Sequence, residues 1–213
     1  MDFLPPEIEA YVEKYTQPEP EVLAELNRDT NANVLVPRML AGHLQGQVLS
    51  MLSKMIQPKK ILEVGTYTGY SAICFAQGLQ PGGVLHTIDI NEELEEMIKK
   101  YFKKAGLENI IQLHIGNATK IIPSLEGPFD IVYIDADKEN YSNYYDLVFD
   151  KVRNGGFIIA DNVLWSGNVM KPEREMDEET KAIVAYCKKV HNDDRVENVI
   201  FPIRDGLMIA RKR

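Results

Sequence analysis

Short apolar segments alternate with longer amphipathic segments along most of this chain, and this pattern constrains its fold more than any other feature. The predicted strands are residues 60–64, 84–88, 110–115, 129–134 and 157–160. The predicted helices that follow them are residues 69–77, 92–105, 118–122, 139–151 and 177–190. Because apolar strands that alternate with helices form parallel sheets covered on both faces, the sequence predicts an α/β fold.

The two ends of the chain depart from this alternation. Helical patterns at residues 6–15, 20–31 and 41–56 precede the first strand, with an irregular connection at residues 32–39. Strands at residues 196–201 and 207–211 follow the last helix, and their short connection predicts an antiparallel hairpin at one edge of the sheet. A length of 213 residues suits one domain, with N-terminal helices over residues 1–57 and an α/β core over residues 58–213.

Charge and hydropathy argue against several classes of protein. A formal net charge of −8 does not favour nonspecific binding to nucleic acid or to an anionic membrane. No apolar run approaches the roughly 20 residues of a membrane-spanning helix, and the acidic, proline-interrupted residues 1–7 do not resemble a signal peptide. Cys74 and Cys187 lie in helical patterns and are predicted to be reduced thiols. We therefore expect a soluble, cytoplasmic protein.

A glycine-containing turn follows the first predicted strand, in the segment ILEVGTYTGYS at residues 61–71. Glycine lets bare backbone approach a ligand, and ligands of open α/β sheets bind beyond the carboxyl ends of the strands. Gly65 and Gly69 follow Glu63, and this arrangement differs from the G-x-G-x-x-G dinucleotide pattern. The turn predicts a cofactor site, with an ordinary strand-to-helix turn as the alternative.

Two further strand ends carry groups that suit a nucleoside cofactor. Asp89 follows the second strand, at a distance from the glycine turn that is typical of a carboxylate accepting hydrogen bonds from ribose hydroxyls. Helix capping is the alternative role for Asp89, but Asn91 is also available as a cap. Residues 116–118, after the third strand, offer backbone and a small side chain to an adenine edge.

The fourth and fifth predicted strands both end in acidic and amide side chains. Asp135 and Asp137 follow the fourth strand, and Asp161 and Asn162 follow the fifth. Because these strands are neighbours in a doubly wound sheet, Asp135, Asp161 and Asn162 are expected to converge at one rim. Their hard oxygen donors suit Mg²⁺, Mn²⁺ or Ca²⁺ rather than zinc. Helix capping is an alternative for Asp137 and Asn162, but it does not explain carboxylates at two strand ends.

Lys138 lies within this acidic cluster, shortly after Asp135. A lysine in such a pocket is a candidate general base for a phenolic proton. The alternative is a solvated lysine paired with Glu139 or Asp137. A lysine in the first turn of a helix is unfavourable against the helix dipole, which favours the catalytic interpretation.

Three segments together resemble the cation-dependent O-methyltransferases, a family that includes catechol and caffeoyl-CoA O-methyltransferases and bacterial relatives. They read EVGTYTGYS at residues 63–71, YIDADKENY at residues 133–141 and ADNVLWSG at residues 160–167. The similarity covers nearly the whole chain. It implies a class I, S-adenosylmethionine-dependent methyltransferase with a Rossmann-like fold, in which a seven-stranded, mostly parallel sheet has an antiparallel last strand and extra N-terminal helices precede the core.

The resemblance also implies roles for individual residues. The metal ligands would be Asp135, Asp161 and Asn162, with Mg²⁺ favoured and Mn²⁺ or Ca²⁺ as alternatives. Lys138 would be the base, with Asp135 beside it in the catalytic centre. The contacts to S-adenosylmethionine would come from Met39, Glu63, Gly65, Thr66, Ser71, Asp89, Ala118, Asp135 and Asp137.

The acceptor pocket is not that of the plant enzymes. Met39, Leu40 and Ala41 stand where the plant caffeoyl-CoA enzymes carry Met-Thr-Thr, and Ser166 replaces an asparagine. We expect a catechol-like small molecule, a vicinal aromatic diol, as the acceptor. The alternatives are a hydroxyuridine in tRNA and a cofactor-binding module without catalysis. The resemblance further implies a homodimer with the N-terminal helices as candidate interface, and no membrane partner.

Histidine, tyrosine and loop residues elsewhere in the chain carry further expectations. His43 is the one histidine close enough to Met39 in sequence to reach the site. Tyr141, Tyr144 and Tyr145 crowd one helix and predict core packing, while the irregular residues 162–176 suggest a lid. Residues 204–206, with an Asp-Gly pair, are explained by turn formation.

Overall fold

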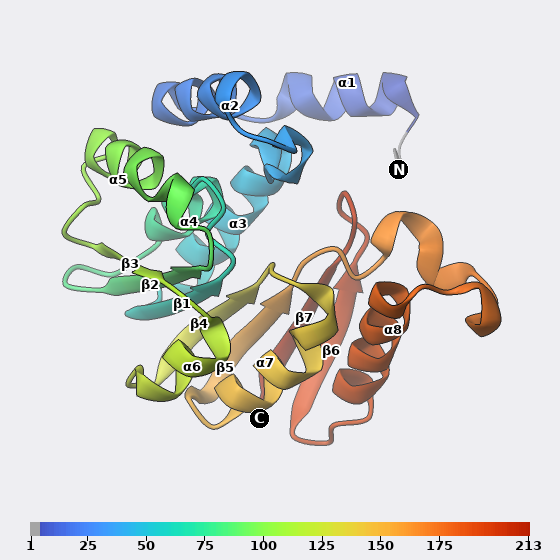
Figure 1. Ribbon diagram of the computed structural model, residues 1–213. Helices are drawn as coiled ribbons and strands as arrows, with labels where there is room; N and C mark the ends of the chain where they lie inside the picture. Colours follow the sequence, from blue (N-terminus) through green and yellow to red (C-terminus); the bar gives the residue numbers. More distant parts are fainter. Residues whose placement is uncertain (1–4) are drawn as a thin grey trace.

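The computed structural model describes residues 5–213 and contains one seven-stranded sheet in the order β3-β2-β1-β4-β5-β7-β6, shown in Figure 1. Residues 1–4, on which part of the expectation about a signal peptide rests, lie outside the described residues. The strands are β1 (Lys60–Val64), β2 (Val84–Asp89), β3 (Ile111–Ile115), β4 (Phe129–Ile134), β5 (Val152–Ala160), β6 (Val196–Phe201) and β7 (Leu207–Lys212).

The strand pairing confirms the predicted fold class. β1 pairs in parallel with β2 and β4, β2 pairs with β3, and β4 pairs with β5. β7 is antiparallel to both β5 and β6, so the predicted hairpin exists and β6 forms the edge. The chain leaves β1 toward β2 on one side and reaches β4 on the other, which creates a switch point. Ligands of such sheets bind at this point, beyond the carboxyl ends of the strands.

Helices cover both faces of the sheet. α2 (Glu21–Asn33), α3 (Gly42–Ile56), α4 (Tyr70–Ala76) and α5 (Glu95–Lys104) lie on one side, and α6 (Ala118–Ile121), α7 (Tyr141–Phe149) and α8 (Glu178–His191) lie on the other (Figure 1). α1 (Pro6–Tyr15) precedes them and has no buried residue. Short 3₁₀ turns are η1 (Pro37–Met39), η2 (Glu92–Leu94), η3 (Ile122–Ser124), η4 (Lys138–Asn140), η5 (Trp165–Met170) and η6 (Glu173–Glu175).

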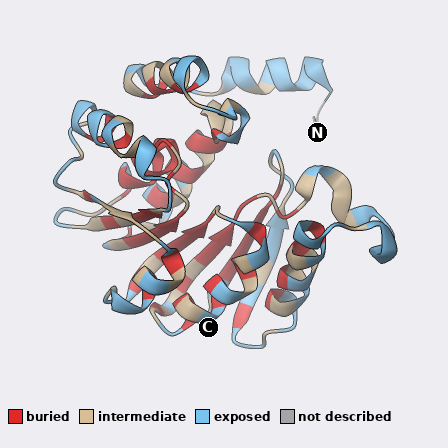
Figure 2. Cartoon of the chain, in the orientation of Figure 1, coloured by how far each residue is buried: buried red, intermediate tan, exposed pale blue. Residues whose placement is uncertain are grey.

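The buried residues form two apolar clusters, one on each face of the sheet. β1 shows the reason: Leu62 and Val64 belong to the cluster under α6–α8, whereas Ile61 belongs to the cluster under α2–α5. Successive side chains of a strand point to opposite faces, so a strand covered on both sides is apolar throughout. Figure 2 shows this burial concentrated on the strands and on the helix sides that face them.

Some element boundaries differ from the prediction. β5 begins at Val152 rather than Phe157, and the helix predicted at 139–151 is the turn η4 followed by the shorter α7. The segment predicted as irregular at 162–176 contains η5 and η6. It is tied to the β6–β7 turn, because the Leu164 amide donates to the Asp205 carbonyl (2.9 Å) and the Ser166 amide to Asp205 Oδ1 (2.6 Å). These distant parts of the chain therefore lie side by side.

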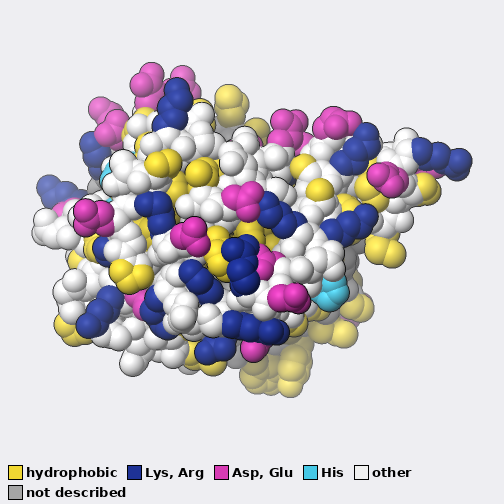
Figure 3. Space-filling view, turned by 90° about the horizontal axis from the view of Figure 1, so that it is seen from below, with side chains coloured by type: hydrophobic (Ala, Val, Ile, Leu, Met, Phe, Trp, Pro, Cys, Tyr) yellow, Lys and Arg dark blue, Asp and Glu magenta, His cyan; other side chains and the backbone are white. Residues whose placement is uncertain are grey.

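The surface is charged with both signs. On the face seen from below in Figure 3, Lys and Arg side chains lie among Asp and Glu side chains, as expected for a solvated surface. No helix within residues 5–213 is both long and apolar enough to cross a membrane.

The turn after β1 depends on glycine for two reasons. Gly65 has φ +102°, and a Cβ added there would lie 1.9 Å from the Asp135 carbonyl oxygen. We expect Gly65→Ala to lower the free energy of unfolding by about 3 kcal/mol or more, since it combines backbone strain with a clash against backbone that cannot rotate away. Urea denaturation measures this change.

Gly82→Ala is the matched control, because Gly82 also has a positive φ (+77°) but open space around the added Cβ. It should cost only about 1–2 kcal/mol, the strain of a left-handed backbone. Equal losses in the two variants would contradict the role given to the contact with Asp135.

Candidate active site

A cleft of about 1800 Å³ opens at the carboxyl ends of the parallel strands. Its walls come from the residues that follow β1 to β5 and from α1, η1, α3, η5 and the β6–β7 turn. The predicted site residues that line it are Met39, Gly65, Thr66, Ser71, Asp89, Ala118, Asp135, Asp137, Lys138, Asp161 and Asn162. Glu63 is the exception, because it lies buried behind the cleft wall.

Backbone hydrogen bonds continue past the strands and position the first residue of each loop. The Gly65 amide donates to the Ile88 carbonyl (2.9 Å), and the Asp135 amide donates to the Val64 carbonyl (2.8 Å). The Asp161 amide donates in the same way to the Ile134 carbonyl (3.0 Å). The side chains of Asp135 and Asp161 therefore start from adjacent, fixed points on the rim.

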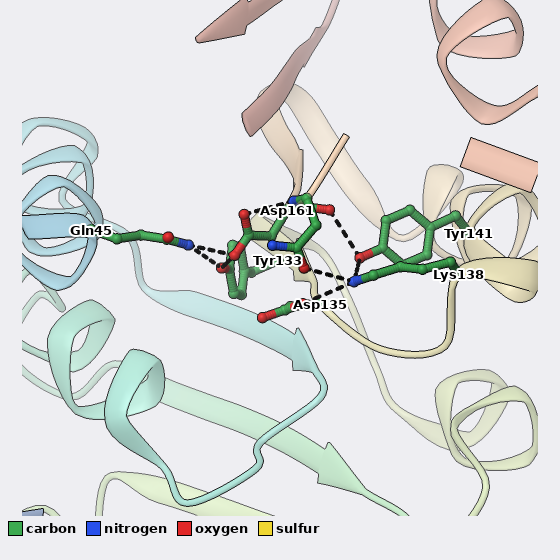
Figure 4. Close-up of polar contacts among 7 residues, drawn as sticks. Gln45, Tyr133, Asp135, Lys138, Tyr141 and Asp161 are labelled. Atoms are coloured by element: carbon green, nitrogen blue, oxygen red, sulfur yellow. Dashed lines mark hydrogen bonds and ion pairs between the residues drawn. The ribbon is translucent and has the colours of Figure 1, made fainter. Parts of the chain in front are cut away.

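Lys138 connects the ends of β4 and β5 (Figure 4). Its Nζ donates to Asp135 Oδ1 (3.1 Å), to Asn162 Oδ1 (2.9 Å) and to the hydroxyl of Tyr141 (2.5 Å). Only 6 % of the residue is exposed, and Nζ lies 5.6 Å from the ring centroid of Trp165. Lys138 is thus a buried cation at the floor of the cleft, and the alternative of a solvated surface lysine is wrong.

Asp161 is held from several sides and is 2 % exposed. Its Oδ1 accepts from the Asn162 amide (2.7 Å), and its Oδ2 accepts from the Tyr133 hydroxyl (2.9 Å) and from Nε2 of Gln45 (Figure 4). Burial, followed by the negative charge of Asp135, raises the pKa of Asp161 to about 6. The carboxylate pair therefore favours a nearby positive charge.

The candidate metal ligands fit a hard divalent cation by their chemistry. Within residues 5–213, no group of three or more His, Cys, Asp or Glu side chains could hold a metal ion, but the predicted set of ligands includes an amide oxygen. Asp135 Oδ1 and Asn162 Oδ1 already share one cation, the ammonium of Lys138, so the space between them accepts positive charge. Oxygen donors of this kind are the ligands that Mg²⁺, Mn²⁺ and Ca²⁺ prefer.

Glu63 is a fully buried carboxyl group on β1. Its Oε2 accepts a hydrogen bond from the hydroxyl of Thr87 (2.5 Å), whereas Oε1 has no hydrogen-bond partner among the described residues. Burial raises the pKa of Glu63 to about 8. An acceptor without a donor is costly in an interior, and a bound ligand with a donor group would relieve that cost.

Asp89 and Asp137 are pre-oriented at the other strand ends. The carboxylate of Asp89 accepts from the backbone amides of Tyr67 (2.6 Å) and Asn91 (2.8 Å), so its orientation does not depend on a ligand. Asp137 accepts from the hydroxyl of Tyr144 (2.5 Å) and from Nδ2 of Asn140 (2.5 Å). Neither carboxylate caps a helix. Asn91, rather than Asp89, caps η2, and Asp137 makes no side-chain cap hydrogen bond to η4.

Three residues of this network were not predicted from the sequence, and one residue outside it was expected at the site. Gln45, Tyr133 and Arg204 reach the site from α3, β4 and the β6–β7 turn, and no local motif marks them. Tyr141 packs in the core as predicted, but its hydroxyl also contacts Lys138. The expectation for His43 is wrong: its Nε2 lies 2.7 Å from the carbonyl oxygen of Gln17, away from the cleft.

The sheet order, the glycine turn and the acidic rim are those of an α/β protein with a ligand site at its switch point. Residues 12–213 match the model of a family described as O-methyltransferase. Caffeoyl-CoA O-methyltransferase 1 of Zea mays is 35 % identical over 205 residues, which cover 91 % of this chain and 79 % of the plant protein. This chain therefore belongs to the O-methyltransferase family.

Solved structures agree in fold and in cofactor. An O-methyltransferase from Bacillus cereus in complex with SAH is 26 % identical, with a TM-score of 0.89 and 97 % of each chain covered. The O-methyltransferase TomG from Streptomyces achromogenes, in complex with SAM, is 26 % identical, with a TM-score of 0.89 and 97 % and 96 % coverage. The predicted enzyme class, an S-adenosylmethionine-dependent O-methyltransferase, is confirmed, and the alternative of a binding module without catalysis is wrong.

The buried carboxyl group of Glu63 predicts a pH-dependent stability. Its pKa is raised from 4.5 to about 8 in the folded chain, so the folded state keeps a proton that the unfolded state loses. The contribution of this group to the free energy of unfolding is fully present below pH 4.5. It is lost as the pH rises to about 8, at about 1.4 kcal/mol per pH unit. Glu63→Gln should remove this loss, and urea unfolding between pH 5 and 8 without added cofactor measures it. Parallel pH profiles for the variant and the wild type would contradict the prediction.

Proposed function

We propose that this enzyme transfers a methyl group from S-adenosylmethionine to one hydroxyl of a catechol-like small molecule, in a reaction that requires a divalent cation. The observation that carries the proposal is the convergence of Asp135, Lys138, Asp161 and Asn162 at the rim of β4 and β5. A vicinal diol would offer two oxygens to one cation, which gives a reason for oxygen donors and a buried lysine to lie together. Mg²⁺ is the favoured ion, and Mn²⁺ or Ca²⁺ are alternatives.

The cofactor half of the site lies at the ends of β1 to β3. Gly65 and Thr66 would bring backbone to the methionine part, and Asp89 would accept hydrogen bonds from the ribose hydroxyls. The unpartnered oxygen of Glu63 and the hydroxyl of Ser71 would face the ammonium group. Ala118 and Asp137 would border the adenine, and Met39 would cover the methyl donor from η1.

The chemical step assigns clear tasks to the side chains. Asp135, Asp161 and Asn162 would hold the divalent cation, whose charge would favour ionisation of the acceptor hydroxyl. With the divalent cation compensating the carboxylates in place of the ammonium, Lys138 would release its proton to solvent and act as the free amine. It would then take the hydroxyl proton, and the acceptor oxygen would form a bond to the methyl carbon while the carbon–sulfur bond breaks. Tyr141 and Asn162 hold Nζ of Lys138 in place through hydrogen bonds, so the base is preorganised. The products are the methyl ether and S-adenosylhomocysteine.

The choice of acceptor rests on the relatives. The plant relatives are caffeoyl-CoA O-methyltransferases, which supports a phenolic acceptor for this chain. The alternative of a hydroxyuridine in tRNA has no support among them.

For assembly we propose a homodimer through α1, since α1 buries none of its residues and exposes Ile8, Tyr11 and Tyr15.

Methyl transfer to different acceptors tests this function directly. Labelled S-adenosylmethionine is supplied with a simple catechol, caffeic acid or bulk tRNA, each with Mg²⁺ and with EDTA. Catechol labelling should fall by roughly two to three orders of magnitude in EDTA, since metal activation contributes several kcal/mol. S-adenosylhomocysteine binding, measured by calorimetry, should persist in EDTA. Undiminished catechol labelling in EDTA would reject the metal requirement, and labelling of tRNA alone would move the acceptor to RNA.

The role of Lys138 as a base predicts a distinct pH profile. Lys138→Met should lower kcat about 100- to 10,000-fold at neutral pH, the usual contribution of general-base catalysis. Part of this loss should be recovered at high pH, because the acceptor hydroxyl then ionises without a base. Lys188→Met, on the exposed side of α8, is the control and should behave like the wild type. An unchanged kcat in Lys138→Met at neutral pH would reject the role.

A further inference from the structure

Gln45 is a buried amide that contacts the candidate metal site without being one of its ligands. The residue is 1 % exposed and projects from α3. Its Nε2 donates to Oδ2 of Asp161 and to the hydroxyl of Tyr133 (3.2 Å), as Figure 4 shows. The Tyr133 hydroxyl donates in turn to the same Asp161 oxygen (2.9 Å). Three polar groups from α3, β4 and the end of β5 therefore form a closed triangle.

Close packing of α3 brings Gln45 to this position. The next residue, Gly46, faces α4, where an added Cβ would lie 2.6 Å from Cε1 of Tyr70 and 2.9 Å from Sγ of Cys74. The absence of a side chain at Gly46 lets the two helices approach until Gln45 reaches the rim of the sheet. The position of the amide is thus set by backbone packing rather than by a flexible surface contact.

Arg204 determines which end of the amide faces Asp161. Its Nη1 donates to Oε1 of Gln45 (3.4 Å) and to the Leu40 carbonyl (3.2 Å). A guanidinium can only donate hydrogen bonds, so Oε1 must face Arg204 and the NH₂ group must face Asp161. The β6–β7 turn, which carries Arg204, is in this way connected to the end of β5 through one side chain.

We propose that Gln45, oriented by Arg204, is a positioning residue that sets the affinity of Asp161 for the divalent cation. With Oδ1 held by the Asn162 amide and Oδ2 held by Gln45 and Tyr133, the Asp161 carboxylate has one orientation before any ion binds. Groups that orient a ligand from behind typically change metal affinity about 10- to 100-fold when removed. This inference rests on the proposed metal dependence.

The experiment measures metal binding directly, apart from turnover. Free Mn²⁺ is followed by electron paramagnetic resonance during titration of the wild type, Gln45→Leu and Gln47→Leu, and S-adenosylhomocysteine affinity is measured on the same samples. Gln47 is on the same helix but lines a separate hollow beside His43 and Cys74, so it is the matched control. Gln45→Leu should weaken Mn²⁺ binding about 10- to 100-fold and leave S-adenosylhomocysteine binding unchanged. Gln47→Leu should change neither affinity.

Kinetics and a second variant separate positioning from a general loss of structure. In Gln45→Leu the apparent KM for Mg²⁺ should rise while kcat at saturating Mg²⁺ changes much less. Arg204→Met should weaken Mn²⁺ binding to a smaller degree. If Arg204 acts through Gln45, the double variant should bind Mn²⁺ no more weakly than Gln45→Leu alone. Arg204 is exposed at the turn, so this variant keeps the test decisive if Gln45→Leu does not fold.

The outcomes distinguish this inference from the proposed function. Wild-type Mn²⁺ affinity in folded Gln45→Leu, or in Arg204→Met if Gln45→Leu does not fold, would overturn the positioning role and leave the metal dependence standing. A lower melting temperature together with weakened S-adenosylhomocysteine binding and unchanged Mn²⁺ binding would show a purely structural role. A wild type that binds no Mn²⁺ and methylates catechols in EDTA would instead reject the proposed function.

Discussion

The close approach of two backbones at the switch point is the constraint on which the rest of the site depends. The carbonyl of Asp135 lies where a Cβ of residue 65 would be, so only glycine allows the loops after β1 and β4 to meet. The hydrogen bond from the Asp135 amide to the Val64 carbonyl holds them there. Under the proposed function this contact joins the cofactor half and the catalytic half of the cleft, so one turn would place the methyl donor next to the acceptor.

Electrostatics decide how the floor of the cleft is organised. Asp161 is buried beside the Asp135 carboxylate, and both effects make its negative charge costly unless a cation or hydrogen-bond donors compensate it. Lys138 supplies the charge, while Gln45, Tyr133 and backbone amides supply the donors. Under the proposed function the same arrangement would serve metal binding, which needs hard oxygens, and proton removal, which needs a base.

Local sequence patterns predicted most of the fold and the principal site residues. Parallel strands covered on both faces are apolar throughout, so β1 to β5 were visible as short runs of Ile, Val and Leu. Boundaries were less predictable where packing overrides propensity. Gly155 and Gly156 disfavour a strand. β5 nevertheless runs through them, because Val152 pairs with Phe129, the first residue of β4. The 3₁₀ turns of residues 165–175 were missed, because η5 contains left-handed residues at Trp165 and Ser166.

The sequence by itself determined the α/β class, the family and the chemical groups at each strand end, since these depend on periodicity and on residues next to one another. Only the tertiary structure decided which side chains hold those groups. Gln45 reaches Asp161 because Gly46 lets α3 pack tightly on α4, and Arg204 reaches Gln45 because β7 lies between β5 and β6. Such contacts join residues far apart in the chain, so no local pattern encodes them, and they exist only once the helices and strands have packed.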